Sequence, residues 1–238
     1  MRPVICLITP PVEDVASGFA PSSSAMARPS EARSAKADSR TVADLVDRIA
    51  AAARAGVQLV QIRQPGLEAR PLTELVTAVL DAVRGSRTRV LVNDRLDVAL
   101  ATGADGVHLR GDSPPAGRIR AVVPRGFLVG RSVHGLEEAQ AVASDGTLDY
   151  LIYGTAFATE SKPGAPGAGN ERLAAVCAAV SVPVLAVGGV TPARLGAVAA
   201  AGADGFAAIG LFARATPASV HEVVEDAVRA FDTPASVP

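Results

Sequence analysis

Short apolar runs alternate with longer amphipathic stretches along most of the chain. Each run is rich in Val, Leu, Ile and Ala and ends at a glycine or a polar residue, as strands of a parallel sheet do. The eight predicted strands cover residues 4–8, 57–63, 89–94, 105–109, 127–132, 149–153, 182–189 and 203–210. The predicted helices cover 41–56, 71–85, 95–103, 119–123, 135–144 and 217–231, with two more between 164 and 182 and after Thr191. This alternation favours an α/β fold, a closed (β/α)8 TIM barrel, over an open doubly wound sheet.

A short motif repeats ahead of two of these strands. Gly103-Ala-Asp-Gly106 and Gly202-Ala-Asp-Gly205 occupy the same place in their strand–helix units, and Ala55-Gly56 is similar. A repeat confined to even-numbered units predicts internal symmetry in the barrel.

Residues 12–40 interrupt the alternation directly after the first strand. They are rich in Ala, Ser and Pro and lack a periodic apolar face. We therefore predict a single domain, 1–238, with a long mobile loop insertion. The insertion falls at the barrel end that carries active sites, so a lid over a substrate is the alternative.

Composition narrows the classes of partner. The 238 residues carry a net charge of −1, and 3 % of them are aromatic, which argues against a nucleic-acid surface. Cys6 and Cys177 predict buried free thiols. No apolar run reaches the length of a membrane span, so we expect a cytoplasmic protein without nucleic-acid or membrane partners. A homodimer is compatible with the sequence.

Polar residues and glycines gather where the predicted strands end, and these ends share one face of a barrel. They are Arg63, Asn93, Asp94, Arg110, Asp112, Ser132, His134, Thr155, Thr159, Ser161, Lys162, Gly188 and Gly189. The cations and hydroxyls suit phosphorylated ligands. Asp94, with Asp112 as a second carboxylate, is a candidate Mg²⁺ ligand, because Mg²⁺ is held by few carboxylates plus substrate phosphates.

Two phosphate sites are predicted on that face. One lies at Arg63, Lys162 and Asp94. The other lies at Gly188-Gly189 and the Ile209-Gly210 turn, where glycine lets backbone approach a ligand and a short helix can start.

Several of these residues also have structural interpretations. Arg63 could form a surface ion pair. Asn93 and Asp94 are strong helix caps, and capping is compatible with metal binding. Asp112 lies in turn-forming sequence. We interpret His108, inside a strand, as a hydrogen-bonded core residue, and for His134 a structural role and proton transfer are both open.

The chain resembles the thiamine phosphate synthase / thiazole tautomerase (TenI) family over nearly its whole length, apart from residues 12–40 and the last few. The matching stretches are Cys6-Leu-Ile-Thr9, Gln61-Ile-Arg63, Val92-Asn-Asp-Arg95, Ala104-Asp-Gly-Val-His-Leu109, Gly130-Arg-Ser-Val-His134, Phe157-Ala-Thr-Glu-Ser-Lys162 and Ala186-Val-Gly-Gly-Val190.

The resemblance implies an enzyme of thiamine biosynthesis. Synthases of this family join hydroxymethylpyrimidine diphosphate (HMP-PP) to thiazole phosphate with Mg²⁺ and release pyrophosphate through a pyrimidine carbocation. The roles implied are Arg63, Asn93 and Lys162 for the diphosphate, Asp94 for Mg²⁺, Ser132 for the pyrimidine, Thr159 and Ser161 for the thiazole, and Gly189 with Ile209-Gly210 for its phosphate. Gln61 and Gly188 join the binding set. The catalytic candidates are Arg63, Ser132, Lys162 and His134.

The chain departs from the synthase pattern at two positions. Pro65 stands where the synthases have a diphosphate-binding Lys, and Ser113 stands where they have a second metal-binding Asp. The Gly-Arg-Ser-Val-His form resembles the tautomerase branch, which moves a proton without Mg²⁺. The His of that branch is Thr155 here, so His134 would carry the proton. We predict a synthase, a transferase of the thiamine-phosphate diphosphorylase type; the tautomerase and a non-catalytic thiazole-phosphate-binding barrel are the alternatives.

Overall fold

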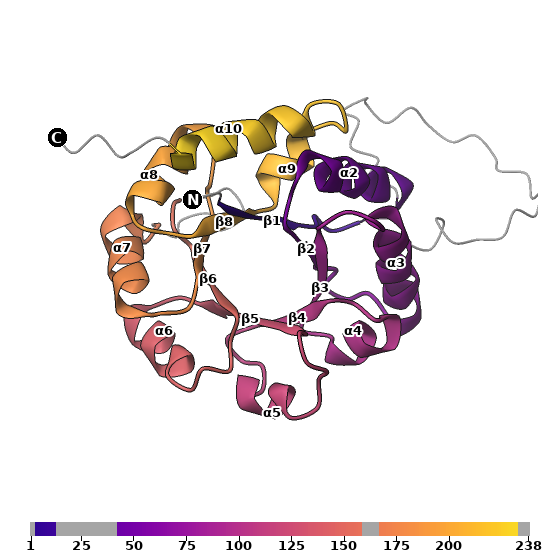
Figure 1. Cartoon of the computed structure of the whole chain (residues 1–238), viewed down its shortest axis with the longest axis horizontal. Coiled ribbons are helices and arrows are strands. Elements are labelled where there is room, and N and C mark those ends of the chain that lie inside the picture. Colours follow the sequence, from indigo (N-terminus) through magenta and orange to yellow (C-terminus); the bar gives the residue numbers. More distant parts are fainter. Residues whose placement is uncertain (1–2, 13–41, 159–166, 233–238) are drawn as a thin grey trace, which may run out of the picture.

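Eight parallel strands close into a barrel with helices around its outside (Figure 1). The computed structural model describes residues 3–12, 42–158 and 167–232. The strands are β1 (Val4–Ile8), β2 (Leu59–Ile62), β3 (Arg89–Asn93), β4 (Gly106–Leu109), β5 (Leu128–Val133), β6 (Tyr150–Gly154), β7 (Val184–Val187) and β8 (Gly205–Ala208). Each strand pairs with its neighbours in sequence and β8 pairs with β1, so the predicted (β/α)8 barrel is confirmed.

Helices connect successive strands on the outside of the barrel. They are α2 (Val42–Ala55), α3 (Ala69–Ala82), α4 (Leu96–Thr102), α5 (Ala116–Arg120), α6 (Leu136–Ala143), α7 (Gly169–Ala179), the 3-10 turn η1 (Pro192–Arg194), α8 (Leu195–Ala200), α9 (Gly210–Arg214) and α10 (Val220–Asp232). The short helix predicted after the last strand is α9. The helix predicted over 119–123 is wrong at its end: α5 stops at Arg120, because Pro124 disfavours helical backbone at Val123.

Alternation along the strands divides the core into two layers. Inward side chains such as Cys6, Leu91 and Leu185 fill the barrel, while outward ones pack against the helices. Gly130 makes room inside for the ring of Tyr150, because a Cβ at Gly130 would collide with that ring. Burial raises the pKa of the Cys6 thiol to about 12, so this free cysteine stays protonated.

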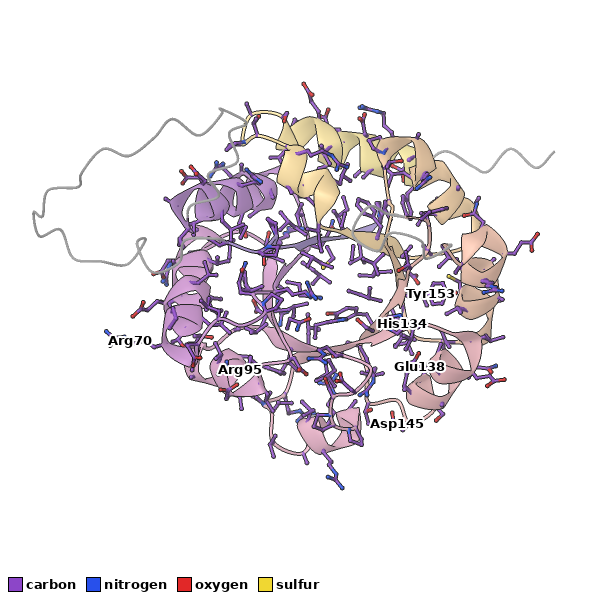
Figure 2. All side chains as sticks on the ribbon, turned by 180° about the vertical axis from the view of Figure 1, so that it is seen from behind. Arg70, Arg95, His134, Glu138, Asp145 and Tyr153 are labelled. Atoms are coloured by element: carbon purple, nitrogen blue, oxygen red, sulfur yellow. The ribbon has the colours of Figure 1, made fainter. Side chains whose placement is uncertain are left out.

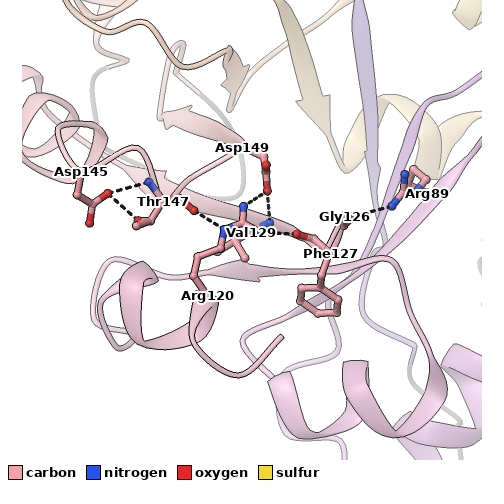
Figure 3. A network of polar contacts seen from close by, with 8 residues as sticks. All are labelled: Arg89, Arg120, Gly126, Phe127, Val129, Asp145, Thr147 and Asp149. Carbon is pink, nitrogen blue, oxygen red and sulfur yellow. Dashed lines mark hydrogen bonds and ion pairs between the residues drawn. The ribbon is translucent and has the colours of Figure 1, made fainter. Parts of the chain in front are cut away.

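The repeated motif has a structural basis at the N-terminal ends of the strands. A side chain just before each even-numbered strand accepts a hydrogen bond from a backbone N–H near the start of the preceding odd-numbered strand. The donors Ile5, Val90, Val129 and Val184 lie 2.7, 2.8, 2.7 and 2.9 Å from the acceptors Gln58, Asp105, Asp149 and Asp204. Figure 3 shows one of the four, where Arg120 also donates to Asp149. The internal symmetry is therefore carried by four equivalent bonds.

Some predictions fall where the structure gives no description. Of the predicted insertion 12–40, residues 13–40 lie outside the described residues, so the single-domain assignment and the insertion stay predictions. None of the helices in the described ranges is long and apolar enough to cross a membrane.

Candidate active site

A cavity of about 1040 Å³ opens at the C-terminal ends of the strands. Every sequence-predicted site residue within the described ranges lines it. They are Gln61, Arg63, Asn93, Asp94, Asp112, Ser132, His134, Gly188, Gly189, Ile209 and Gly210. Thr159, Ser161 and Lys162 lie outside the described residues. The barrel thus gathers candidates that are far apart in sequence, as parallel strand ends do.

The floor of the cavity is a buried chain of hydrogen bonds across β4, β5 and β6. His108 Nε2 lies 2.8 Å from Ser132 Oγ, and His108 Nδ1 lies 3.0 Å from Tyr150 Oη. Burial, with the charge of Arg131, lowers the pKa of His108 to about 3, so the ring is neutral at neutral pH. The prediction of a hydrogen-bonded core histidine is confirmed, and this histidine fixes the Ser132 hydroxyl at the cavity wall.

Gln61 reaches the same cavity from β2. Its side chain is buried, and its Nε2 has no hydrogen-bond partner among the described residues. A buried donor left without a partner costs about 1–3 kcal/mol. Gln61 is therefore a donor available to an occupant of the cavity.

Asp94 has a backbone conformation that is uncommon for a residue other than glycine. Its φ of 62° lies in the left-handed region, and it is the one non-glycine residue there in the described part of the chain. Its carboxylate accepts a hydrogen bond from Ser113 Oγ and lies 3.7 Å from Arg110 Nη1. The alternative that Asn93 and Asp94 cap a helix is wrong, because α4 has Arg95 as its N-cap and no side-chain cap.

Asp112 is the second carboxylate of the predicted metal pair. It lies in the turn predicted for it, and its Oδ2 is 2.5 Å from Arg110 Nη2. Across residues 3–12, 42–158 and 167–232, no three His, Cys, Asp or Glu side chains gather as metal ligands. Among the described residues, a metal site here would rest on Asp94 with Asp112 as the second carboxylate, which suits a cation that substrate phosphates help to hold.

Arg131 was not predicted as a site residue, yet it holds the loop between β4 and α5. It is buried on the outward face of β5, and its guanidinium donates to the carbonyls of Gly111, Ser113 and Pro114 at 2.7, 2.9 and 3.0 Å. Ser113 lies in the same loop, and its hydroxyl donates a hydrogen bond to Asp94. Arg131 therefore positions a neighbour of the candidate metal ligand.

Gly188 and Gly189, which follow β7, lie against residues 155–158, which follow β6. Gly188 and Gly189 have φ values of 95° and 62°, and a Cβ on Gly189 would lie 2.5 Å from the Ala158 carbonyl oxygen. Arg194 stabilises the contact between Gly189 and Phe157. Its Nη1 donates to the Gly189 carbonyl at 2.8 Å, and its guanidinium lies over the Phe157 ring. Glycine is thus required here by protein packing, a constraint that the sequence did not reveal.

His134 follows β5 and is held on two sides. Its backbone N–H donates to Glu138 Oε2 at 2.7 Å, and both residues are labelled in Figure 2. Its Nδ1 bonds the Gly154 carbonyl. Because a carbonyl only accepts hydrogen bonds, Nδ1 carries the proton. Nε2 is then the ring atom left for proton transfer.

Known proteins match the chain over most of its length. Residues 35–212 match the family model described as thiamine monophosphate synthase. A thiamine-phosphate synthase from Methanoculleus marisnigri is 44 % identical over 171 residues, which cover 71 % of this chain and 79 % of that protein. One from Roseiflexus castenholzii is 41 % identical over 166 residues, 69 % of this chain and 72 % of that protein.

Solved structures agree with these matches. A thiamine phosphate pyrophosphorylase from Pyrococcus furiosus superposes with a TM-score of 0.71 at 26 % identity, covering 96 % of this chain and 95 % of that one. A 3-hexulose-6-phosphate synthase, at 20 % identity and a TM-score of 0.62 over 97 % of this chain and 99 % of that one, shares the fold alone. The matches along the sequence and the superposed barrel lead to one conclusion: the chain belongs to the thiamine monophosphate synthase family.

Proposed function

We propose that the protein is a thiamine phosphate synthase, a transferase that joins HMP-PP to thiazole phosphate and releases pyrophosphate. The observation that carries the proposal is a single cavity with Arg63, Asn93 and Asp94 at the ends of β2 and β3 and Gly188 and Gly189 at the end of β7. Two phosphorylated substrates could therefore meet over one barrel floor. Relatives named thiamine-phosphate synthase, 33–44 % identical to this chain, support the same reaction.

The diphosphate half of the proposed site lies at β2 and β3. Arg63, Asn93 and Lys162 are proposed to bind the diphosphate. Asp94 would hold Mg²⁺, which would supply positive charge to stabilise the leaving group. Asp94 fits this role because it lines the cavity and its side chain is 33 % exposed there. Asp112 is a secondary candidate, with its side chain 70 % exposed.

The remaining candidates divide between the two rings. Gln61 and Ser132 offer donors to the pyrimidine, with Ser132 held by the neutral His108. For the thiazole, Thr159 and Ser161 are proposed contacts. Its phosphate is proposed to lie at Gly188-Gly189 and the Ile209-Gly210 turn, which line the cavity on the side of β7 and β8.

The reaction needs no oxidant or reductant. The C–O bond between the pyrimidine methylene and the diphosphate breaks, and its electron pair leaves with pyrophosphate. The thiazole nitrogen then supplies the pair for the new C–N bond. What the protein must provide is orientation of the two rings and stabilisation of the charge on the leaving group.

The test incubates purified protein with HMP-PP and thiazole phosphate, with and without EDTA. Asp94→Asn is the informative variant, because Asn tolerates the left-handed backbone at this position and removes only the charge. We expect thiamine phosphate to form only without EDTA, and Asp94→Asn to reduce the rate about 100-fold, the scale of a lost metal contribution. Thiazole phosphate should bind both proteins equally.

The outcomes separate the alternatives. A wild-type protein that forms no thiamine phosphate at any Mg²⁺ concentration would contradict the synthase. Proton exchange on the thiazole carboxylate, lost in His134→Ala, would then identify the tautomerase. Binding of thiazole phosphate without either reaction would leave the non-catalytic barrel.

A further inference from the structure

Positive charge exceeds negative charge on the cavity wall in the part of the chain that the structure describes. The charged side chains that line it are Arg63, Arg95, Arg110, Arg194 and Arg214, against Asp94 and Asp112. Five arginines against two aspartates favour an anionic occupant.

Two of these arginines flank the end of β3. Arg63 follows β2 and Arg110 follows β4, and both strands pair with β3, whose end carries Asn93 and Asp94. Arg110 Nη1 lies 3.7 Å from Asp94 Oδ2. An anion seated over the end of β3 would therefore have a guanidinium on either side.

Arg110 can leave Asp112 and bind a ligand at little cost in free energy. Arg95 is held by Asp97 through two bonds of 2.9 and 2.6 Å. Arg194 is tied to the Gly189 carbonyl. The pair of Arg110 with Asp112 is more open to solvent than the pair of Arg95 with Asp97: its side chains are 56 % and 70 % exposed, against 34 % and 63 %. Such exposed pairs contribute little to stability.

We infer that Arg110 binds the diphosphate of the substrate, an inference that rests on the proposed function. Its planar guanidinium donates parallel N–H bonds to phosphate oxygens across from Arg63, in place of Asp112. When the C–O bond breaks and its electron pair stays on pyrophosphate, Arg110 stabilises the charge that the leaving group gains. In the sequence Arg110 was one of several polar residues that follow a strand, and no motif assigned it to the diphosphate.

The test compares Arg110→Met with Arg118→Met, which removes the same charge from an exposed position on α5 outside the cavity lining. Calorimetry with inorganic pyrophosphate and Mg²⁺ should show a Kd about tenfold or more higher for Arg110→Met, the effect of losing a charge-assisted pair. The KM for HMP-PP should rise in parallel, while the Kd for thiazole phosphate stays the same. Arg110→Lys should recover part of the affinity.

The results that would overturn the inference are distinct from those that would overturn the synthase. An unchanged pyrophosphate Kd in a folded Arg110→Met protein refutes the role of Arg110. So does tighter Mg²⁺ binding with an unchanged pyrophosphate Kd, because Arg110 would then only compete with the metal for Asp94. A wild-type protein that binds pyrophosphate but forms no thiamine phosphate refutes the synthase, and the Kd comparison still decides the role of Arg110. If the wild type does not bind pyrophosphate, the inference fails.

Discussion

His108 makes the stability of the barrel depend on pH. Burial lowers its pKa from 6.5 to about 3 in the folded protein, whereas in the unfolded chain it titrates near its ordinary value. Between these values the unfolded state binds more protons, so stability falls as pH falls, and the contribution is complete above about pH 6.5. Between pH 7 and pH 5 this histidine should remove about 2 kcal/mol from the free energy of unfolding.

Denaturant unfolding of wild type and His108→Gln at pH 7 and pH 5 measures the contribution of His108 to this pH dependence. Gln keeps hydrogen-bonding capacity toward Ser132 and Tyr150 but does not titrate. The variant should lose about 2 kcal/mol less than wild type between pH 7 and pH 5. Parallel losses in the two proteins would show that His108 does not carry the acid sensitivity.

Gly189 supports a second prediction at the scale of one residue. The φ of Gly189 is 62°, and the Ala158 oxygen lies 2.5 Å from the position that a Cβ would take. Even Gly189→Ala must therefore displace the backbone of Phe157 and Ala158. The strain should cost about 1–3 kcal/mol of stability and weaken the binding of thiazole phosphate at least tenfold. Gly196→Ala, where no atom lies within 4 Å, is the matched control. Equal affinity in a folded Gly189→Ala protein would remove this glycine from the proposed phosphate site.

At the scale of elements, the loop from β4 to α5 depends on Arg131. Replacing it by Met leaves three backbone carbonyls without their charged donor, which should cost about 2–4 kcal/mol. The loop would also release Ser113 from Asp94, so the Mg²⁺ concentration for half-maximal activity should rise. The control is Arg70→Met, an exposed position on α3 that points away from the barrel (Figure 2). A fall in stability with an unchanged Mg²⁺ requirement would restrict Arg131 to a structural role.

The strands could be placed from the sequence because each buried strand is an apolar run, and the run stops where the chain leaves the barrel. The strand over 4–8 was predicted with its true bounds, and the polar residues after strands were brought to one cavity by the topology alone. Arg131 was missed because a charged residue on the outward face of a strand is unexpected, and only tertiary contacts reveal its carbonyl partners. The end of α5 was missed because helical periodicity continued past Arg120.

For the whole molecule, the two ends of the barrel have separate tasks. The C-terminal end carries the cavity, and the N-terminal end carries the four equivalent bonds to Gln58, Asp105, Asp149 and Asp204. In (β/α)8 enzymes, the C-terminal face is associated with catalysis and the opposite face with stability. Changes at the N-terminal end should therefore alter the free energy of unfolding without altering ligand affinity.

Asp204→Ala and Asp105→Ala test this division. Each removes a charged acceptor from a backbone N–H, of Val184 and of Val90, and should cost about 1–3 kcal/mol. Their strand pairs, β3–β4 and β7–β8, lie apart in the barrel order, so the double variant should show the sum of the two losses to within about 0.5 kcal/mol. Asp47→Ala, at an exposed position on α2, should change stability little. The Kd values for pyrophosphate and thiazole phosphate should match those of wild type in all of these proteins. A variant that keeps its stability yet loses ligand affinity would show that the two ends of the barrel are coupled.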